Sequence, residues 1–518
     1  MWRPLVYSLF AFFCIPECGA QTVLYSPEWR VNNNTRYEVA GKVGPRYWVL
    51  AQSGGEMYSS EKNTRKKPLT QQFLVFDGGM NRAGESRVFT VPENTEKVFL
   101  VPGNRFMDRL LVMNEYGQTR LIVQRIDPSL NGEDQSREMT VFPFPESGNS
   151  FLLARCENRQ RILLLCFEGV PEAPPRLHAL QFDENWNLLS SYVYDQPNIS
   201  QPLIQDDFIS YPLEYFNSAA IQLADNGQWL MASRSRSNNN YLLFHFCAND
   251  PALSFKEMNI PEHAQLEDVS LSLNNKSGEA FAGLLCRFKY PTMKSVQVAH
   301  YSLIDQAFDF DSSYRFNTLN GITIQRTNLS RERFTAVPGR GFMLMKEYGK
   351  SYDDLQDIIQ ETPWDVQALF AGNGIATNAF MRGMNRDSYT RSDRLSAIGN
   401  RYTRGDLCLF YLPAVRGDSS WCGLLNKEQF TDFNSPWLSY LFLSSGSTFY
   451  FLYNTVYGDE QSGSSTLLDA KGNEETGGVV FWKYRVNLDF QQARRIEDHE
   501  VAVPYLGSGR TGFAVIRL

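Results

Sequence analysis

The chain has 518 residues, of which 43% are apolar, 14% aromatic and 21% charged, and its net charge is −7. The apolar content is sufficient for a large core, and the high aromatic share favours stacked sheets over helices with many surface positions. The mild negative charge argues against non-specific nucleic-acid binding, which requires clustered lysine and arginine side chains to neutralise phosphates.

Residues 1–20 have the features of a secretory signal peptide. Arg3 precedes an apolar stretch from Leu5 to Ile15, and the small residues before Gln21 form a cleavage site. The stretch is too short to cross a bilayer, and no other uncharged apolar segment is long enough; a buried first strand is the alternative. We therefore expect a mature chain of residues 21–518, exported to the periplasm or the extracellular space without a transmembrane segment.

Six cysteines remain after residue 20, and no two have C-x-x-C spacing. Most lie in apolar, strand-like runs such as 163–167, which is typical of cysteines that act as small buried hydrophobic residues. Export would also permit disulfides, and Cys408 with Cys422 is the pair to consider. Both interpretations stay open at the level of sequence.

A short turn element recurs along the chain. It follows an apolar strand-like run and consists of Asp, Asn or Ser, two further residues, and a large apolar side chain. The eight copies begin at Ser26, Asp77, Asp127, Asp183, Asp250, Asp305, Asp418 and Asn487. Asp and Asn accept hydrogen bonds from the backbone two residues ahead and so begin turns. The copies are 50 to 69 residues apart, except for one interval of 113 that contains an insertion.

A second hairpin recurs between these turns, in which two apolar strands are joined by a polar turn. Residues 221–223 and 229–231, for example, flank the tight-turn sequence 225–227. Several of these strands are apolar throughout, which indicates burial on both faces, whereas the remaining strands alternate. This gradient is expected from the inner to the outer strands of a blade that packs between two neighbours.

The pattern resembles β-propeller repeat proteins over nearly the whole mature chain, without the signature of a named subfamily. The resemblance implies an all-β, eight-bladed propeller of four-stranded antiparallel blades. Counting inner hairpins gives eight, the last at the C-terminus, while residues 22–25 and 28–31 form an outer hairpin without an inner partner. We expect both ends to share a composite closing blade, which pairs otherwise exposed strand edges. Seven blades, and then a series of β-sandwiches, are the alternatives.

The long loops predict which face of the propeller is functional. They join second to third strands or one blade to the next, and both kinds of connection lie on one face; long loops in compact domains are usually functional. The longest insertion, 350–404, has an acidic first half and a second half that combines arginines with tyrosines. The candidate ligand-binding residues are Trp364, Arg386, Tyr389, Arg391, Arg394, Arg401 and Tyr402. They would form a lid or pocket for an anionic or carbohydrate ligand; alternatively, the two halves pair with each other.

The common catalytic motifs are absent from the sequence. The run 507–512 matches G-x-G-x-x-G, but the chain ends six residues later in a strand-like segment, so the helix that such a site requires cannot follow. The five histidines have no metal-ligand spacing. We therefore predict no cofactor and no metal, and no catalytic residue can be named.

Three functions remain open at this stage. The first is a secreted binding module for a glycan, peptide or protein partner. The second is an enzyme that acts on a polysaccharide, as a hydrolase or lyase, through carboxylates near the central channel. The third is an assembly factor at an envelope surface. The oligomeric state cannot be inferred from the sequence.

Overall fold

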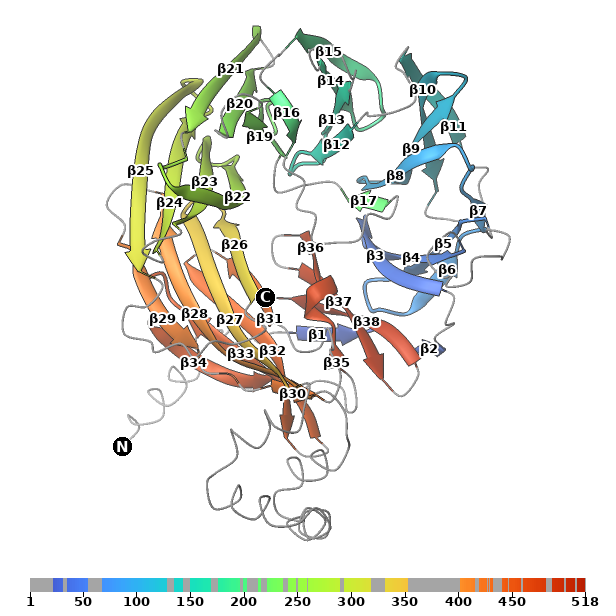
Figure 1. Ribbon diagram of the computed structural model, residues 1–518. Helices are drawn as coiled ribbons and strands as arrows, with labels where there is room; N and C mark the ends of the chain where they lie inside the picture. The colour runs from blue at the N-terminus through green and yellow to red at the C-terminus, as the bar shows by residue number, and fades with distance from the viewer. Residues whose placement is uncertain are drawn as a thin grey trace, which may run out of the picture.

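The fold is seen in a computed structural model that describes most of the repeat region. The described residues are 22–30, 35–54, 68–127, 135–142, 150–168, 176–195, 199–202, 213–215, 221–235, 241–247, 250–258, 260–288, 293–317, 331–352, 401–414, 419–425, 427, 429–431, 440–445, 447–457, 460–480, 487–497, 500–507 and 510–517. The strands within these ranges form eight sheets arranged in a ring, as Figure 1 shows.

Seven sheets take their main strands from one continuous stretch of chain each and are numbered as blades 1 to 7. Blade 1 contains β3 (Thr35–Val43), β4 (Arg46–Ser53), β5 (Thr70–Phe76), β6 (Arg82–Glu85) and β7 (Phe89–Thr90). Blade 2 contains β8 (Thr95–Pro102), β9 (Met107–Glu115), β10 (Gln118–Ile126) and β11 (Gln135–Phe142), with β17 (Leu213–Tyr215) added in parallel to β8. Blade 3 contains β12 (Ser150–Arg155), β13 (Arg161–Glu168), β14 (Arg176–Asp183) and β15 (Leu188–Asp195). Blade 4 contains β16 (Ile199–Pro202), β18 (Ile221–Leu223), β19 (Trp229–Ser235), β20 (Tyr241–Cys247) and β21 (Asp250–Met258).

Blade 5 contains β22 (Ala264–Asn274), β23 (Glu279–Phe288), β24 (Met293–Ser302) and β25 (Ala307–Asn317). Blade 6 contains β26 (Arg331–Val337), β27 (Gly341–Tyr352), β28 (Arg401–Pro413), β29 (Trp421–Leu425) and β30 (Gln429–Thr431). Blade 7 contains β31 (Tyr440–Ser445), β32 (Thr448–Tyr457), β33 (Glu460–Leu468) and β34 (Glu474–Val480). The closing blade contains β35 (Asn487–Leu488), the 3-10 helix η2 (Phe490–Gln492), β36 (Arg494–Glu497), β37 (Glu500–Gly507), β38 (Arg510–Arg517), β1 (Thr22–Tyr25) and β2 (Trp29–Arg30).

Apolar side chains on both faces of each sheet hold the ring together. Eight buried clusters each join two neighbouring sheets, and one of them closes the ring by joining the closing blade to blade 1. Alternation within β4 shows the principle, because Tyr47 and Val49 face the closing blade while Trp48 and Leu50 face blade 2. The continuously apolar strands are therefore buried on both faces, as predicted. The all-β propeller is confirmed, with a ring of eight sheets of which seven come from continuous stretches of chain.

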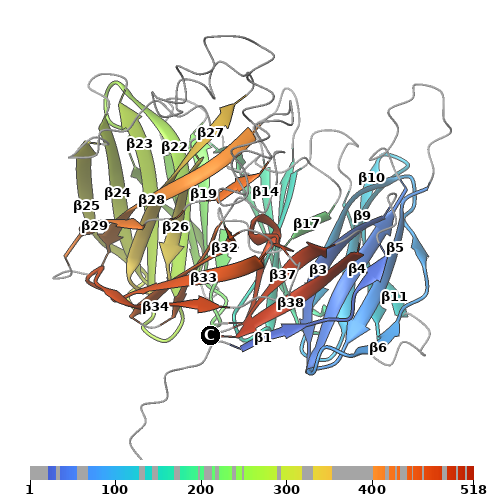
Figure 2. The same cartoon turned by 90° about the horizontal axis from the view of Figure 1, so that it is seen from below.

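The two ends of the chain meet in the closing blade. β1 pairs antiparallel with β38, with Leu24 opposite Val515, and Figure 2 shows the two strands side by side. Ser26 strengthens the junction, because its backbone N–H donates to the Phe513 carbonyl (3.0 Å) and its Oγ accepts from the Phe513 N–H (3.0 Å). The Tyr505 hydroxyl also donates to the Ser26 carbonyl at 2.9 Å. The predicted sharing of one sheet by both ends is confirmed.

The predicted hairpin at the N-terminal end is a single interrupted strand. β1 and β2 both pair with β38, one after the other, and not with each other. Pro27 lies between them and has no N–H to give to a ladder, so pairing stops and resumes at Trp29. The N-terminal segment thus supplies only the outermost strand of the closing blade, whereas β36 and β37 come from the C-terminal end.

The recurring turns join third to fourth strands in several blades. At Asp77 and Asp183, the carboxylate accepts two backbone N–H groups, and the apolar fourth residue, Met80 or Trp186, is buried at positive φ. The copy assigned to Asn487 is wrong, since that residue lies in β35. In blade 7 the corresponding turn begins at Asp469. Its fourth residue is glycine, so the turn lacks the large apolar side chain by which the other copies were recognised.

The boundaries of the long insertion also differ from the prediction. β27 continues to Tyr352 and β28 begins at Arg401, with Tyr402 opposite Ser351, so both ends of the predicted loop 350–404 are strand. Residues 353–400 lie outside the described residues. Cys408 and Cys422 are both free, and Cys408 lies opposite Leu424 in the ladder, so the disulfide alternative is wrong.

Gly512 offers a test of the junction between the chain ends. A Cβ at this position would lie 2.4 Å from the Tyr505 ring and 2.9 Å from Ser26 Oγ. We expect Gly512→Ala to lower the free energy of unfolding by about 1–3 kcal/mol, because overpacking forces neighbouring groups to move. Gly78→Ala is the control, since a Cβ there meets only the Pro45 carbonyl at an ordinary 3.7 Å and the backbone is not at positive φ, so stability should stay within about 0.5 kcal/mol of wild type. Denaturant unfolding measures both, and a Gly512→Ala variant with wild-type stability would show that the junction tolerates a wider separation.

Candidate functional site

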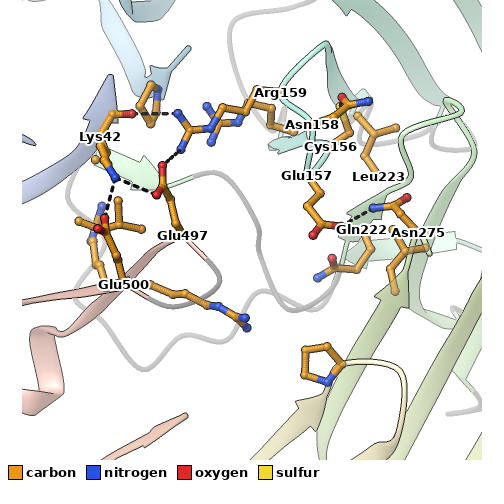
Figure 3. A pocket seen from close by; sticks show the side chains of 18 of the residues that line it. Lys42, Cys156, Glu157, Asn158, Arg159, Gln222, Leu223, Asn275, Glu497 and Glu500 are labelled. Atoms are coloured by element: carbon orange, nitrogen blue, oxygen red, sulfur yellow. Dashed lines mark hydrogen bonds and ion pairs between the residues drawn. The ribbon is translucent and has the colours of Figure 1, made fainter. Parts of the chain in front are cut away.

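A large cavity lies where the first strands of the blades meet around the centre of the ring. Its volume is about 1500 Å³, and the ends of first strands, or the turns that follow them, contribute to its wall from all eight sheets. Figure 3 shows part of this wall. We call this cavity the channel mouth. Because strands in a blade are antiparallel, these turns lie on the face opposite the second-to-third-strand loops.

The channel mouth carries positive charge although the whole chain is acidic. Its basic lining residues are Lys42, Arg155, Arg159, Lys276, Arg340, Arg494, Arg495 and Arg517. Its acidic lining residues are Glu157, Glu497 and Glu500. The described lining thus has a net charge of +5, against −7 for the chain. Walls of low dielectric strengthen the field of such a concentration of charge.

An ion-pair network occupies one side of the channel mouth, at the seam between the closing blade and blade 1. Lys42 Nζ donates to Glu497 and to Glu500, each at 2.8 Å, as Figure 3 shows. Arg517 Nε donates to the other oxygen of Glu500 at 2.8 Å, and the Tyr47 hydroxyl donates to Glu500 at 3.0 Å. The network therefore links residues that are more than 450 positions apart in the chain.

The pKa values in this network follow from its hydrogen bonds. Burial opposes ionisation of Glu500, but its hydrogen bond and attraction to Lys42 outweigh burial and hold the pKa of this carboxyl below its ordinary value. Burial likewise opposes the charge on Lys42, yet hydrogen bonds to Glu497 and Glu500 raise the pKa of the ammonium group overall. Both side chains are consequently charged at neutral pH.

Arg159 extends the network to blade 3. Its Nη1 donates to the Lys42 carbonyl at 3.1 Å, and its Nη2 lies 3.7 Å from a Glu497 oxygen. Arg159 has a φ of 62°, which is costly for a residue with a side chain and is maintained where the surrounding structure enforces it. The turn that follows β12 is thus shaped so that a guanidinium reaches across the channel mouth.

The other side of the channel mouth is rich in amide groups. Asn275 Nδ2 donates to Glu157 at 2.9 Å, and Asn275 Oδ1 accepts the backbone N–H of Asp225 at 2.9 Å. Asp225 in turn accepts the backbone N–H of Asn158 at 3.0 Å. These bonds join the inner turns of blades 3, 4 and 5 into a continuous polar rim.

Two further arginines contribute cations that are costly to desolvate. Burial lowers the pKa of Arg155 and of Arg494 to about 9. A guanidinium nevertheless keeps its proton in proteins. Since the surroundings disfavour the charge, a bound anion would compensate both groups. Lys276 and Arg340 complete the basic set, and among the described residues neither side chain makes a hydrogen bond or an ion pair.

The structure leaves the predicted site untested. Trp364, Arg386, Tyr389, Arg391 and Arg394 lie outside the described residues. The description of Arg401 and Tyr402 covers their place in β28 but not their side chains. The predicted pocket and its glycan, peptide or protein ligand stay predictions.

The prediction missed the channel mouth, although a signal was present in the sequence. Basic residues occur in first strands near the channel mouth, or in the turn that follows, in blades 1, 3, 5 and 6 and in the closing blade. The repeat register would reveal this pattern once the first strands are aligned. The turns that carry these residues are short, and a short turn does not by itself indicate a binding site.

The described residues contain no helix long and apolar enough to span a membrane. Within the same residues, no group of three or more His, Cys, Asp or Glu side chains could hold a metal ion.

No known protein family and no curated protein matches the chain. Solved structures with similar folds include the Dos1 propeller, at 11% identity and a TM-score of 0.42, covering 95% of this chain and 94% of that one. The polysaccharide lyase Uly1 is 11% identical with a TM-score of 0.35, covering 95% and 99%. Cobalt-substituted ACO from Synechocystis is 9% identical with a TM-score of 0.28, covering 54% and 60%. At these values the similarities carry no argument about ligand or activity.

The ion-pair network predicts an acid-sensitive component of stability. We expect Glu500→Gln to lower the free energy of unfolding at pH 7 by about 1–2 kcal/mol, because charge-assisted hydrogen bonds from Lys42 and Arg517 are weakened. The pKa of Glu500 is lowered in the folded protein. The stabilisation by the Glu500 carboxylate is therefore complete above the pKa of a glutamate in the unfolded chain, about 4.3. It is lost as the pH falls through the lower pKa that Glu500 has in the folded protein.

Urea unfolding of wild type and variant between pH 7 and pH 3 measures this effect. The difference in free energy of unfolding between wild type and Glu500→Gln should shrink as the pH falls. A difference that stays constant with pH would contradict a stabilising role of the ionised Glu500. Glu497→Gln is the control, because that side chain is 42% exposed and its ion pair should contribute less than about 1 kcal/mol.

Proposed function

We propose that the protein is a binding module that holds an anionic saccharide in its channel mouth. The single observation that carries the proposal is the net charge of +5 on the described lining of the cavity, set in an acidic chain. A ligand with carboxylate, sulfate or phosphate groups would offset the desolvation of Arg155 and Arg494. Guanidinium groups suit this role because they bind such anions through two parallel hydrogen bonds.

The amide groups of the rim support a saccharide as the carrier of the negative charge. The lining includes Asn104, Asn158, Gln222, Asn274 and Asn275. Each amide can both donate and accept a hydrogen bond, as sugar hydroxyl groups require. The volume of about 1500 Å³ exceeds that of typical small-molecule pockets, roughly 300–1000 Å³, and would accommodate several sugar rings.

The carboxylates of the channel mouth favour binding over hydrolysis. A glycosidase needs one carboxyl with a raised pKa to protonate the leaving group, whereas the pKa of Glu500 is lowered by its bond to Lys42. Glu497 shares the same ammonium group. Tyr47 is fully buried, and burial raises the pKa of its hydroxyl, so the hydroxyl stays protonated at neutral pH and is not available as a base. The polysaccharide-acting alternative therefore has no support from these groups.

Export to the periplasm or the extracellular space is part of the proposal, and the signal-peptide features of residues 1–20 support it. The insertion joins β27 to β28 at the end of blade 6 away from the channel mouth, so its arginine- and tyrosine-rich part would form a separate anion-binding contact. Its sequence supports this role through Arg386, Arg391 and Tyr389.

Calorimetric titration with a panel of saccharides tests the proposal. The panel contains uronic-acid trisaccharides, their methyl esters, sulfated disaccharides and a glutamate hexapeptide. We expect an acidic saccharide to bind, its neutral ester to bind at least tenfold more weakly, and affinity to fall with added NaCl because salt screens the charges. Preference for the hexapeptide would show that the partner is an acidic peptide, and equal affinity for acid and ester would refute the role of charge.

Charge-neutralising variants locate the site. Lys276→Gln and Arg340→Gln should each weaken binding of the acidic saccharide by about tenfold or more, the loss expected for one hydrogen bond to a charged group. Neither should change the melting temperature, because their side chains have no partner among the described residues. Lys471→Gln is the matched control, since this exposed lysine lies in the outer turn of blade 7. A Lys471→Gln variant with an equal loss would point to non-specific charge attraction.

A further inference from the structure

A second, smaller pocket lies at the seam, toward the opposite end of β3 from the channel mouth. Its volume is about 310 Å³, and it is lined by β2 of the closing blade and by strands β3 to β6 of blade 1. β3 contributes Thr35 and Tyr37 to this pocket, whereas Gly41 and Lys42, at its other end, line the channel mouth. The two cavities are therefore separate. We call the smaller one the seam pocket.

The strand pattern shows why the seam pocket is polar. The face of blade 1 that meets the closing blade carries Val39 and Val49 in its buried part. Four residues along the same strands, on the same face, the side chains change to Thr35 and Ser53, and both line the pocket. Among the described residues, the closing blade contributes only Trp29 and Arg30 of β2 to this end of the seam. A face built only for sheet packing would not need these hydroxyl groups.

An aromatic pair forms one wall of the seam pocket. Trp29 packs edge-to-face on Tyr37 at 5.5 Å between ring centroids and stacks on Phe76 at 5.7 Å. Trp29 Nε1 is buried, and it has no hydrogen-bond acceptor among the described residues. A buried indole N–H usually finds an acceptor. This wall thus offers aromatic surface to the pocket, whereas the indole N–H lies beneath that surface.

Polar groups that can both donate and accept form the remaining walls. The hydroxyls of Ser53 and Thr70 are 2.8 Å apart, so each retains bonding capacity beyond the bond they share. Arg82 and Glu85 form an exposed ion pair at the rim, which offers a guanidinium donor next to a carboxylate acceptor. Such a pair matches neighbouring hydroxyls on one sugar ring, where one accepts from Arg82 and the next donates to Glu85.

We propose that the seam pocket binds one ring of a neutral glycan, a hexopyranose, against Trp29 and Tyr37, with its hydroxyls on the Arg82–Glu85 pair. The apolar face of the sugar covers aromatic surface. The volume lies near the lower limit of small-molecule pockets, roughly 300 Å³, which suits one or two rings. By contrast, the described lining of the channel mouth contains no aromatic residue, so the two sites select different ligands.

A glycan array containing neutral and acidic oligosaccharides, followed by saturation-transfer NMR on the neutral hits, tests this proposal. We expect wild type to bind at least one neutral hexose-containing glycan, and Arg82→Met to weaken that binding tenfold or more. Thr35→Val, which removes a hydroxyl at nearly constant shape, should weaken it several-fold. Both variants change exposed or half-buried groups, so melting temperatures should stay at the wild-type value.

Arg176→Met is the matched control, because Arg176 forms an equally exposed ion pair with Asp195 on blade 3. It should leave neutral-glycan binding unchanged. The absence of any neutral hit for wild type, or an equal loss in Arg176→Met, would overturn the proposal. Arg340→Gln should weaken binding of acidic saccharides only, and Arg82→Met binding of neutral glycans only. The two variants therefore test the channel mouth and the seam pocket independently of each other.

Discussion

The pairing of β1 with β38 is the contact on which the rest of the structure depends. A propeller without it would leave β38 as an open edge and would expose the apolar surfaces that the closing blade buries against blades 7 and 1. Exposed edges invite association with other chains. Because the joined segments are separated by nearly the whole chain, the pairing carries a large loop-closure entropy. Ser26 and Tyr505 help to offset it with hydrogen bonds that only the closed ring can form.

Both candidate sites border the seam between the closing blade and blade 1. The Lys42–Glu500 ion pair joins blade 1 to the closing blade at the channel mouth, and Trp29 meets Tyr37 at the seam pocket. The seam is where two stretches of unrelated position in the chain must fit together. At the end of β3 where the seam pocket lies, the two blades pack incompletely and leave room for the pocket. At the opposite end of β3, close polar contacts hold the wall of the channel mouth in place. Ring closure and binding surface thus come from the same contacts.

The repeat pattern was sufficient to predict the propeller and its shared closing sheet, because periodic apolar strands and Asp-initiated turns are local signals. The pattern did not predict features that depend on contacts between segments far apart in the chain. The sequence of β1 and β2 has the pattern of a hairpin, yet both strands pair with β38. Each strand pairs with the sheet edge that lies beside it in the folded chain. Asp469 escaped the turn pattern because Gly472 replaces its apolar residue.

The site was harder to predict than the fold for a physical reason. Arg155, Arg340 and Arg494 lie in three different sheets, and each is an ordinary strand-end residue in its own segment. Only the radial arrangement brings them to one axis, where their fields add. The same arrangement explains why an acidic chain can attract an anion. Negative side chains spread over a wide outer surface are screened within about 8–10 Å at physiological salt, whereas cations gathered in a recess are screened less.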